Sequence, residues 1–171
     1  MAKKSFNMSM IGNILQVSTN ELDSYLKDSS LLEKRIFDNE SGDQNLTDIE
    51  KAWHGIVFLL TGKDWDESNE SLARILFSGQ LIDEEQDFGY GPAHYLTPDQ
   101  VINLNERISQ VVIGDLKQRF DPKKMTELEI YPMIWDEGDD AFDYLSEYFE
   151  ILKKTYSEAA MKKNAIITFL S

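Results

Sequence analysis

The chain has 171 residues, 42% of them hydrophobic and 11% aromatic, which is enough apolar material for one domain with its own core. Its 17 basic and 31 acidic residues give a formal net charge of −14, which argues against binding nucleic acid or an anionic membrane through charge alone. The absence of cysteine excludes disulfides, zinc–thiolate sites and thiol nucleophiles, and the absence of a long apolar run argues against a membrane span.

The predicted elements begin after a short polar start. Residues 1–7 are basic but contain no apolar segment of signal-peptide length, so we treat them as an N-terminal extension and expect a cytoplasmic protein. The apolar residues 10–17 do not alternate strictly with polar ones, which is typical of a strand buried on both faces. Ser18 and Glu21 then form a capping-box pattern that predicts a helix, and the turn-rich residues 38–45 indicate a surface loop.

The strongest helical signal covers residues 45–62. Thr47 followed by Glu50 fits a capping box, and Gly62 fits a left-handed stop. Apolar residues at spacings of three and four predict a broad core-facing stripe made of Ile49, Ala52, Trp53, Ile56, Val57 and Leu60. Phe58 lies opposite this stripe, so we expect a second layer to cover the far side of the helix.

The middle of the chain alternates charged loops with short apolar segments. We expect Trp65 to fold back onto the core from a charged segment. Two glycines and a proline at residues 89–92 shape a loop that leads into a strand at residues 93–96. Thr97, Pro98 and Gln100 supply an N-cap, a first-turn proline and a capping-box partner, so a helix begins there.

The last part of the chain predicts a long helix and a terminal strand. Apolar residues recur at three and four over residues 139–163, with acids at the positive helix end and lysines nearer the negative end. Residues 165–170 form an apolar strand that must be paired and covered. We therefore expect one compact α+β domain over residues 8–171. Its small mixed sheet, built from the strands near residues 10–17, 93–96 and 165–170, is packed by the helices that begin at Thr47 and Asp139.

Several segments resemble one family, in the order in which the family has them. They are Met8-Ser-Met-Ile-Gly-Asn13, Lys51-Ala-Trp-His-Gly55, Leu59-Leu-Thr-Gly62, Gly89-Tyr-Gly-Pro-Ala93, Tyr95-Leu-Thr-Pro98, Tyr131-Pro132, Ile134-Trp-Asp136 and Phe169-Leu-Ser171. Over residues 8–171 the chain thereby resembles the YfbM-like family of bacterial proteins of unknown function. The resemblance implies a compact bacterial α+β domain and supplies no activity, cofactor or catalytic residue.

Two histidines are the candidate catalytic groups. His54 and His94 could converge with an acid from Glu85, Asp87 or Asp136 into a general acid–base site, as in a small hydrolase or transferase. The structural alternative is that His54 pairs with Glu50 across one helical turn while His94 satisfies a backbone group. No nucleotide-binding or nucleophile-elbow fingerprint accompanies them.

Two loops have both a binding and a structural reading. The amides of residues 89–92 could hold an anion, but the carboxylates before them favour a simple turn. The acids of residues 136–140 lack the ligand spacing of an EF-hand, so they favour charge complementation at a helix N-terminus. The sequence therefore predicts neither a metal site nor a cofactor.

Aromatic and acidic residues suggest a partner. Loop aromatics beside glycine are typical of a binding cleft, with core packing as the alternative; the candidates are Trp53, Tyr90, Tyr95, Tyr131 and Trp135. The acidic candidates are Asp83, Glu84, Glu85, Asp87, Asp139 and Asp140, whose potentials would add if the fold brought them to one side. We interpret the protein as a non-catalytic acidic binding or inhibitor module, immunity-like, for a basic protein such as a toxin or nuclease, with the histidine enzyme as the alternative.

Overall fold

The computed structural model describes residues 9–171, which form a four-stranded sheet with helices on both faces. The strand order is β2-β1-β4-β3, with β1 at Gly12–Val17, β2 at Leu46–Asp48, β3 at His94–Leu96 and β4 at Ala165–Leu170. The α+β class is confirmed. Every strand pair is antiparallel, however, so the expectation of a mixed sheet was wrong. The extension predicted at residues 1–7 lies outside the described residues.

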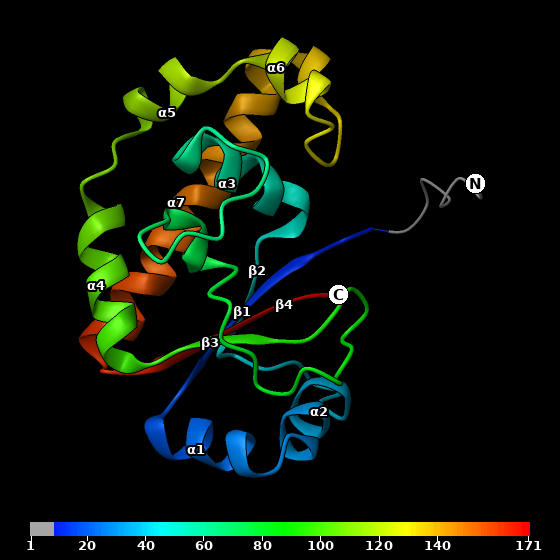
Figure 1. The fold of residues 1–171 in the computed structure, drawn as a ribbon, viewed down its shortest axis with the longest axis vertical. Coiled ribbons are helices and arrows are strands. Elements are labelled where there is room, and N and C mark those ends of the chain that lie inside the picture. The colour runs from blue at the N-terminus through cyan, green and yellow to red at the C-terminus, as the bar shows by residue number, and fades with distance from the viewer. Residues whose placement is uncertain (1–8) are drawn as a thin grey trace.

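The helices form a small layer and a large layer (Figure 1). The small layer contains α1 (Thr19–Lys27) and α2 (Ser30–Phe37). The large layer contains α3 (Trp53–Thr61), α4 (Pro98–Ser109), α5 (Ile113–Arg119), α6 (Pro122–Glu127) and α7 (Asp139–Met161). Short 3-10 turns η1 (Glu50–Ala52), η2 (Leu72–Ile75) and η3 (Trp135–Glu137) connect some of these elements. Within residues 9–171, no helix combines the length and the apolar character needed to cross a membrane.

Neighbouring residues of the central strands point into two different cores. Ile14 of β1 and Ile166 of β4 pack with the large helical layer, whereas Leu15 and Ile167 pack with α1 and α2. Such burial on both faces explains why these strands lack polar alternation. The terminal strand β4 lies between β1 and β3, so the expectation that it is paired and covered is confirmed.

Local capping patterns succeed at two helices and fail at the third. The predicted capping boxes at Ser18 and Thr97 are both formed, and Gly62 ends α3 with φ of 72°. Thr47 does not begin a helix, because residues 46–48 instead pair with β1 as an edge strand. The chain then turns through Glu50, whose φ is 52°, and η1 before α3 starts. The apolar stripe predicted for this region is buried nonetheless.

Candidate functional site

The two histidines stand at the ends of one row of aromatic rings. His54 stacks on Trp53 with ring centroids 4.9 Å apart, Trp53 meets Phe77 edge-on at 5.7 Å, and Phe77 meets His94 edge-on at 5.7 Å. Two aromatic rings therefore separate the imidazoles in this row. Among residues 9–171, none of Glu85, Asp87 or Asp136 forms a hydrogen bond to either histidine. The convergence on one acid–base site, which the sequence left open as an alternative, is not formed by these residues.

Both ring nitrogens of His54 are engaged. Nε2 lies 2.6 Å from Oδ1 of Asp64, and Nδ1 accepts a hydrogen bond of 2.9 Å from the Tyr131 N–H. The expected pairing with Glu50 was wrong, because the partner comes from the loop that follows α3. An imidazole held on both nitrogens orients two chain segments, and it has no free nitrogen with which to take a proton from a substrate.

His94 matches its structural reading. The Gly79 N–H donates to Nδ1 at 3.1 Å, which requires that nitrogen to be unprotonated. Burial lowers the pKa of His94, which further favours the neutral form of the ring. It thus fixes the turn that follows η2, as the backbone-satisfying alternative predicted.

The five candidate aromatics do not gather in one cleft. Trp53 and Tyr131 stack at 5.9 Å, and both hydrogen-bond to the backbone of Met10. Trp135 is buried to 1% exposure and donates its Nε1–H to the Ile130 carbonyl, so it is a core residue. Tyr95 packs against the core beneath α1 and α2, and Tyr90 is a half-buried residue of the glycine loop.

Trp65 also departs from expectation. Its side chain is 48% exposed, and it leans on Phe77 with ring centroids 4.9 Å apart instead of entering the core. Its Nε1–H donates to a carboxylate oxygen of Glu67. The indole therefore covers the outer side of the aromatic row.

The carboxylates before the glycine loop build local structure. Oδ1 of Asp87 accepts from the N–H groups of Gly91 and Gly89 at 3.0 and 2.8 Å, and these bonds hold the pKa of Asp87 below its usual value. Two of the N–H groups that could have held an anion, those of Gly89 and Gly91, are thus already occupied. Asp83 accepts from the Ser29 hydroxyl and the Glu85 N–H, which lower its pKa in the same way.

The two acidic runs do not share one face. Asp83 contacts Ser29 at the start of α2, in the small helical layer, whereas Asp139 begins α7 and pairs with Lys117 of α5, in the large layer. Figure 1 shows these helices on opposite sides of the sheet. The potentials of the two runs therefore do not reinforce each other at one surface. Within residues 9–171 no group of three or more acidic or histidine side chains is placed to hold a metal ion.

A different acidic surface lies where η1 meets α7. Tyr144 and Tyr148 meet edge-on at 5.1 Å, and the Lys51 N–H donates to the Tyr144 hydroxyl at 3.0 Å. Burial raises the pKa of Tyr144 to about 12, with Tyr148 and Glu50 adding to the rise. Burial also raises the pKa of Tyr148. The negative charges of Glu50, Glu147 and Asp48 raise this pKa further. We call Asp48, Glu50, Tyr144, Glu147 and Tyr148 the tyrosine–carboxylate patch.

The sequence reasoning missed this patch although it carried a signal. Tyr144 and Tyr148 are four residues apart on a predicted helix, and Glu147 lies beside them, so they share one face. Asp48 and Glu50 join that face only because β2 and η1 replace the predicted helical start. The patch therefore depends on the same element that the capping pattern misassigned.

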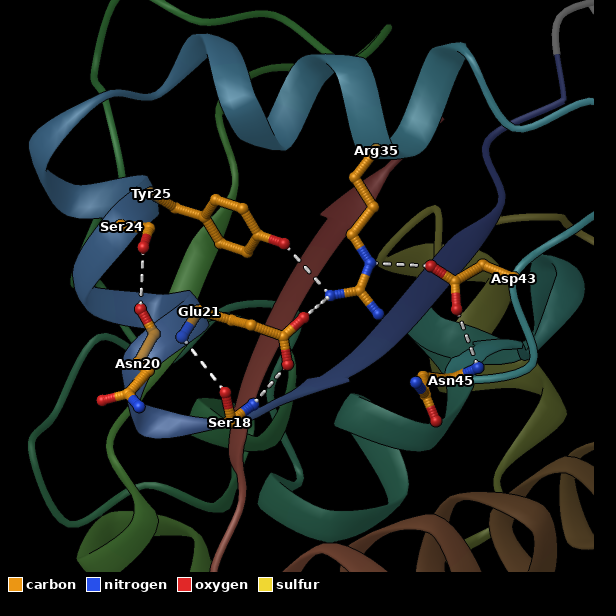
Figure 2. A network of polar contacts seen from close by, with 8 residues as sticks. All are labelled: Ser18, Asn20, Glu21, Ser24, Tyr25, Arg35, Asp43 and Asn45. Carbon is orange, nitrogen blue, oxygen red and sulfur yellow. Dashed lines mark hydrogen bonds and ion pairs between the residues drawn. The ribbon is translucent and has the colours of Figure 1, made fainter.

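The densest ionic network is structural. Figure 2 shows Arg35 of α2 held between Asp43 and Glu21, with the Tyr25 hydroxyl as a third partner. The guanidinium lies 2.7 Å from Asp43, whose pKa it holds below the usual value. The network ties α1, α2 and the loop before β2 together, with one guanidinium shared between two carboxylates.

Comparison with known proteins places the chain in a family. The family model described as "Domain of unknown function (DUF1877)" matches residues 8–169. Protein YfbM of Escherichia coli strain K12 is 29% identical over 129 residues, covering 73% of this chain and 74% of that protein. The crystal structure of YfbM from Escherichia coli, titled a protein of unknown function, superimposes with a TM-score of 0.75 at 19% identity, covering 95% of this chain and 100% of that one. The resemblance to the YfbM-like family that the sequence motifs indicated is confirmed, and the chain therefore belongs to the DUF1877 family.

Proposed function

We propose that the protein is a non-catalytic binding module whose tyrosine–carboxylate patch receives a basic segment of a protein partner. The observation that carries the proposal is the edge-on pair of Tyr144 and Tyr148 where α7 meets η1, with the charges of Glu50, Glu147 and Asp48 near enough to raise the pKa of Tyr148. Within residues 9–171, no lysine or arginine forms a salt bridge with any of these three carboxylates. Their charge is therefore left for a partner to neutralise.

The composition of the patch suits that role. Tyrosine is enriched at interface hot spots because its ring supplies a large contact area and its hydroxyl a polar handle. Tyr144 and Tyr148 are both half-buried, so each keeps part of its surface free while helix α7 holds the ring in place. Arginine and lysine favour such a site, since they bind carboxylates and lie over aromatic faces.

The state of the histidines supports a binder over an enzyme. His54 and His94 are both engaged by neighbouring backbone N–H groups. The formal charge of −14 would accelerate the approach of a basic partner at low ionic strength. An immunity-like inhibitor of a basic toxin or nuclease is one protein class with these properties.

A comparative pull-down tests the proposal. The bait is the full chain, and the patch variant carries Asp48→Asn, Glu50→Gln and Glu147→Gln, which remove three charges and keep the side-chain shapes. A matched control carries Glu84→Gln, Glu85→Gln and Asp136→Asn, which remove three exposed charges elsewhere. The captured proteins are identified by mass spectrometry from lysate of the native host at low and high salt.

The expected result is a basic protein that the wild-type chain and the control capture at low salt, and that the patch variant captures at least tenfold less. Enrichment that falls with rising salt follows from screening of surface charges. The proposal is wrong if no basic protein is enriched, or if the patch variant captures the same proteins as the wild-type chain. Loss of capture in the control alone would refute the patch and move the interface to one of the two acidic runs that the control changes, near Asp83 or near Asp136.

A further inference from the structure

A second surface feature is a cavity of about 350 Å³ between the segment that leads into η2 and helix α4. Four charged side chains line it: Glu70, Arg74, Asp99 and Arg107. Its volume is at the lower end of the range for small-molecule sites, which is about 300–1,000 Å³. It lies apart from the tyrosine–carboxylate patch, since none of the patch residues lines it.

The two arginines are held by the backbone and lack acidic partners. Arg107 donates from Nη2 to the Glu70 carbonyl at 2.6 Å, and Arg74 donates from Nη1 to the Asn69 carbonyl at 3.2 Å. Because these carbonyls belong to consecutive residues, both guanidiniums lie against one short segment. Nε of Arg74 is buried and has no hydrogen-bond partner within residues 9–171. Each guanidinium has five N–H donors. One of them is used on a carbonyl and the Nε of Arg74 is buried, so the remaining Nη donors are those that a ligand could meet.

The charges that line the cavity are balanced but not paired. Glu70 and Asp99 carry two negative charges, which equal in number the two positive charges of the arginines. No salt bridge joins any of these four side chains within the part of the chain that the structure describes. A charged side chain without a salt-bridge partner gains from any group of opposite charge that comes close to it. A ligand that fits must therefore bring an anionic group to the arginines and a cationic group to the carboxylates.

We propose that this cavity binds a small zwitterion of the amino acid class. The ligand carboxylate lies against Arg74 and Arg107, whose planar forks match its geometry. The ligand ammonium lies toward Glu70 and Asp99. Multiply charged phosphates are disfavoured, because the two carboxylates of the cavity would repel them without offering a donor.

The test is an NMR chemical-shift titration of the full chain with each common amino acid at millimolar concentration. For the tightest binder, two matched probes follow: the analogue without its amino group and the analogue without its carboxylate. For glutamine these are 4-carbamoylbutanoate and 4-aminobutanamide. We expect the amino acid to shift backbone resonances of residues 69–74 and 99–107, and each analogue to bind at least tenfold more weakly.

Variants separate a binding role from a structural one. Arg74→Gln should weaken binding of the amino acid about ten- to a hundredfold, which is the effect expected from losing one charge-assisted hydrogen bond. Asp99→Asn leaves both arginine tethers and Glu70 in place and should reduce the preference for the amino acid over its deaminated analogue. Arg119→Gln is the matched control, since Arg119 also donates to backbone carbonyls, at Leu59 and Leu60, but lines no part of this cavity.

Three outcomes would overturn the proposal. One is that no amino acid shifts the resonances of the cavity residues. Another is that the deaminated analogue binds as tightly as the amino acid, which would make the cavity a plain anion site. The last is that Arg119→Gln weakens binding as much as Arg74→Gln, which would show a general effect of charge.

Discussion

Adding one methyl group at Gly55 should destabilise the protein, although it would strengthen an isolated helix. Gly55 lies inside α3 where this helix meets α7. A Cβ atom built on it would come within 2.7 and 2.8 Å of the two terminal carbons of Leu145 and within 2.9 Å of the Trp135 ring. Both neighbours are buried, at 0% and 1% exposure, so neither can swing into solvent. Gly55→Ala therefore requires the two helices to move apart.

The magnitude follows from two opposing terms. Overpacking a well-filled core costs about 1–3 kcal/mol. Replacing glycine by alanine inside a helix gains about 1 kcal/mol from backbone entropy. Because the added methyl group meets two rigidly placed side chains at once, we expect the upper half of the overpacking range and a net loss of about 1–2 kcal/mol.

Denaturant unfolding at fixed pH measures this loss directly. Gly114→Ala is the matched control, since a Cβ atom at that helical position meets nothing within 4 Å, and it should leave stability unchanged or raise it. The double variant with Leu145→Ala should cost less than the sum of the single variants, because removing the leucine methyls makes room. A Gly55→Ala protein as stable as the wild type, or strict additivity in the double variant, would refute the packing argument.

Three further changes test other parts of the fold. Trp53→Ala empties a large buried site and should cost about 3–5 kcal/mol in thermal or denaturant melts, whereas Trp65→Ala, at an exposed position, should cost little. Deleting residues 165–171 removes the strand between β1 and β3, so the product should show no cooperative unfolding transition; a cooperative one would make β4 peripheral. Arg35 lowers the pKa of Asp43 in the folded state. The contribution of this pair to folding stability is therefore present above the usual carboxylate pKa of about 4 and is lost as the pH falls below it. Arg35→Gln should therefore reduce stability at neutral pH and show a shallower loss on acidification, which melts along a pH series would detect.

Elements fixed by local chemistry were predictable, and those fixed by distant partners were not. The capping boxes at Ser18 and Thr97 need acceptors only three residues away, so the sequence alone could place them. Thr47 carries the same pattern and forms an edge strand, because pairing with Ile14 of β1 competes with the helix. That competition depends on where β1 lies, and no short pattern records it. The apolar stripe was still assigned correctly to the core, since burial follows composition more than secondary structure.

The candidate site shows the same division. His54 could be singled out by residue type, but its partners Asp64 and Tyr131 are 10 and 77 residues away along the chain. The acidic runs were conspicuous in sequence and proved to lie on opposite sides of the sheet, with several of their carboxylates used as turn acceptors. Arg74 and Arg107 were passed over because each alone is an ordinary surface arginine. Their significance appears only when both are seen to bind one segment.

The loop between α3 and η2 links His54 to the proposed zwitterion cavity. Asp64 near its start is held by His54, and the Glu70 carbonyl near its end is held by Arg107. A loop fixed at one end loses less conformational entropy when a ligand orders the other end. Asp64→Ala should therefore weaken amino acid binding without altering any residue of the cavity.

The tether is a hydrogen bond from Nε2 of His54 to a half-exposed carboxylate, so the effect should be on the order of 0.5–1 kcal/mol, or about two- to fivefold in Kd. The NMR titration measures it, with Asp23→Ala on the distant helix α1 as the control for lost charge. An unchanged Kd in Asp64→Ala would mean that the arginines alone order the loop, and that His54 serves only the packing of α3. A raised Kd in Asp64→Ala with an unchanged Kd in Asp23→Ala would show that His54 helps to position the cavity through the loop. Its role would then be structural, and not the proton transfer that its residue type suggests.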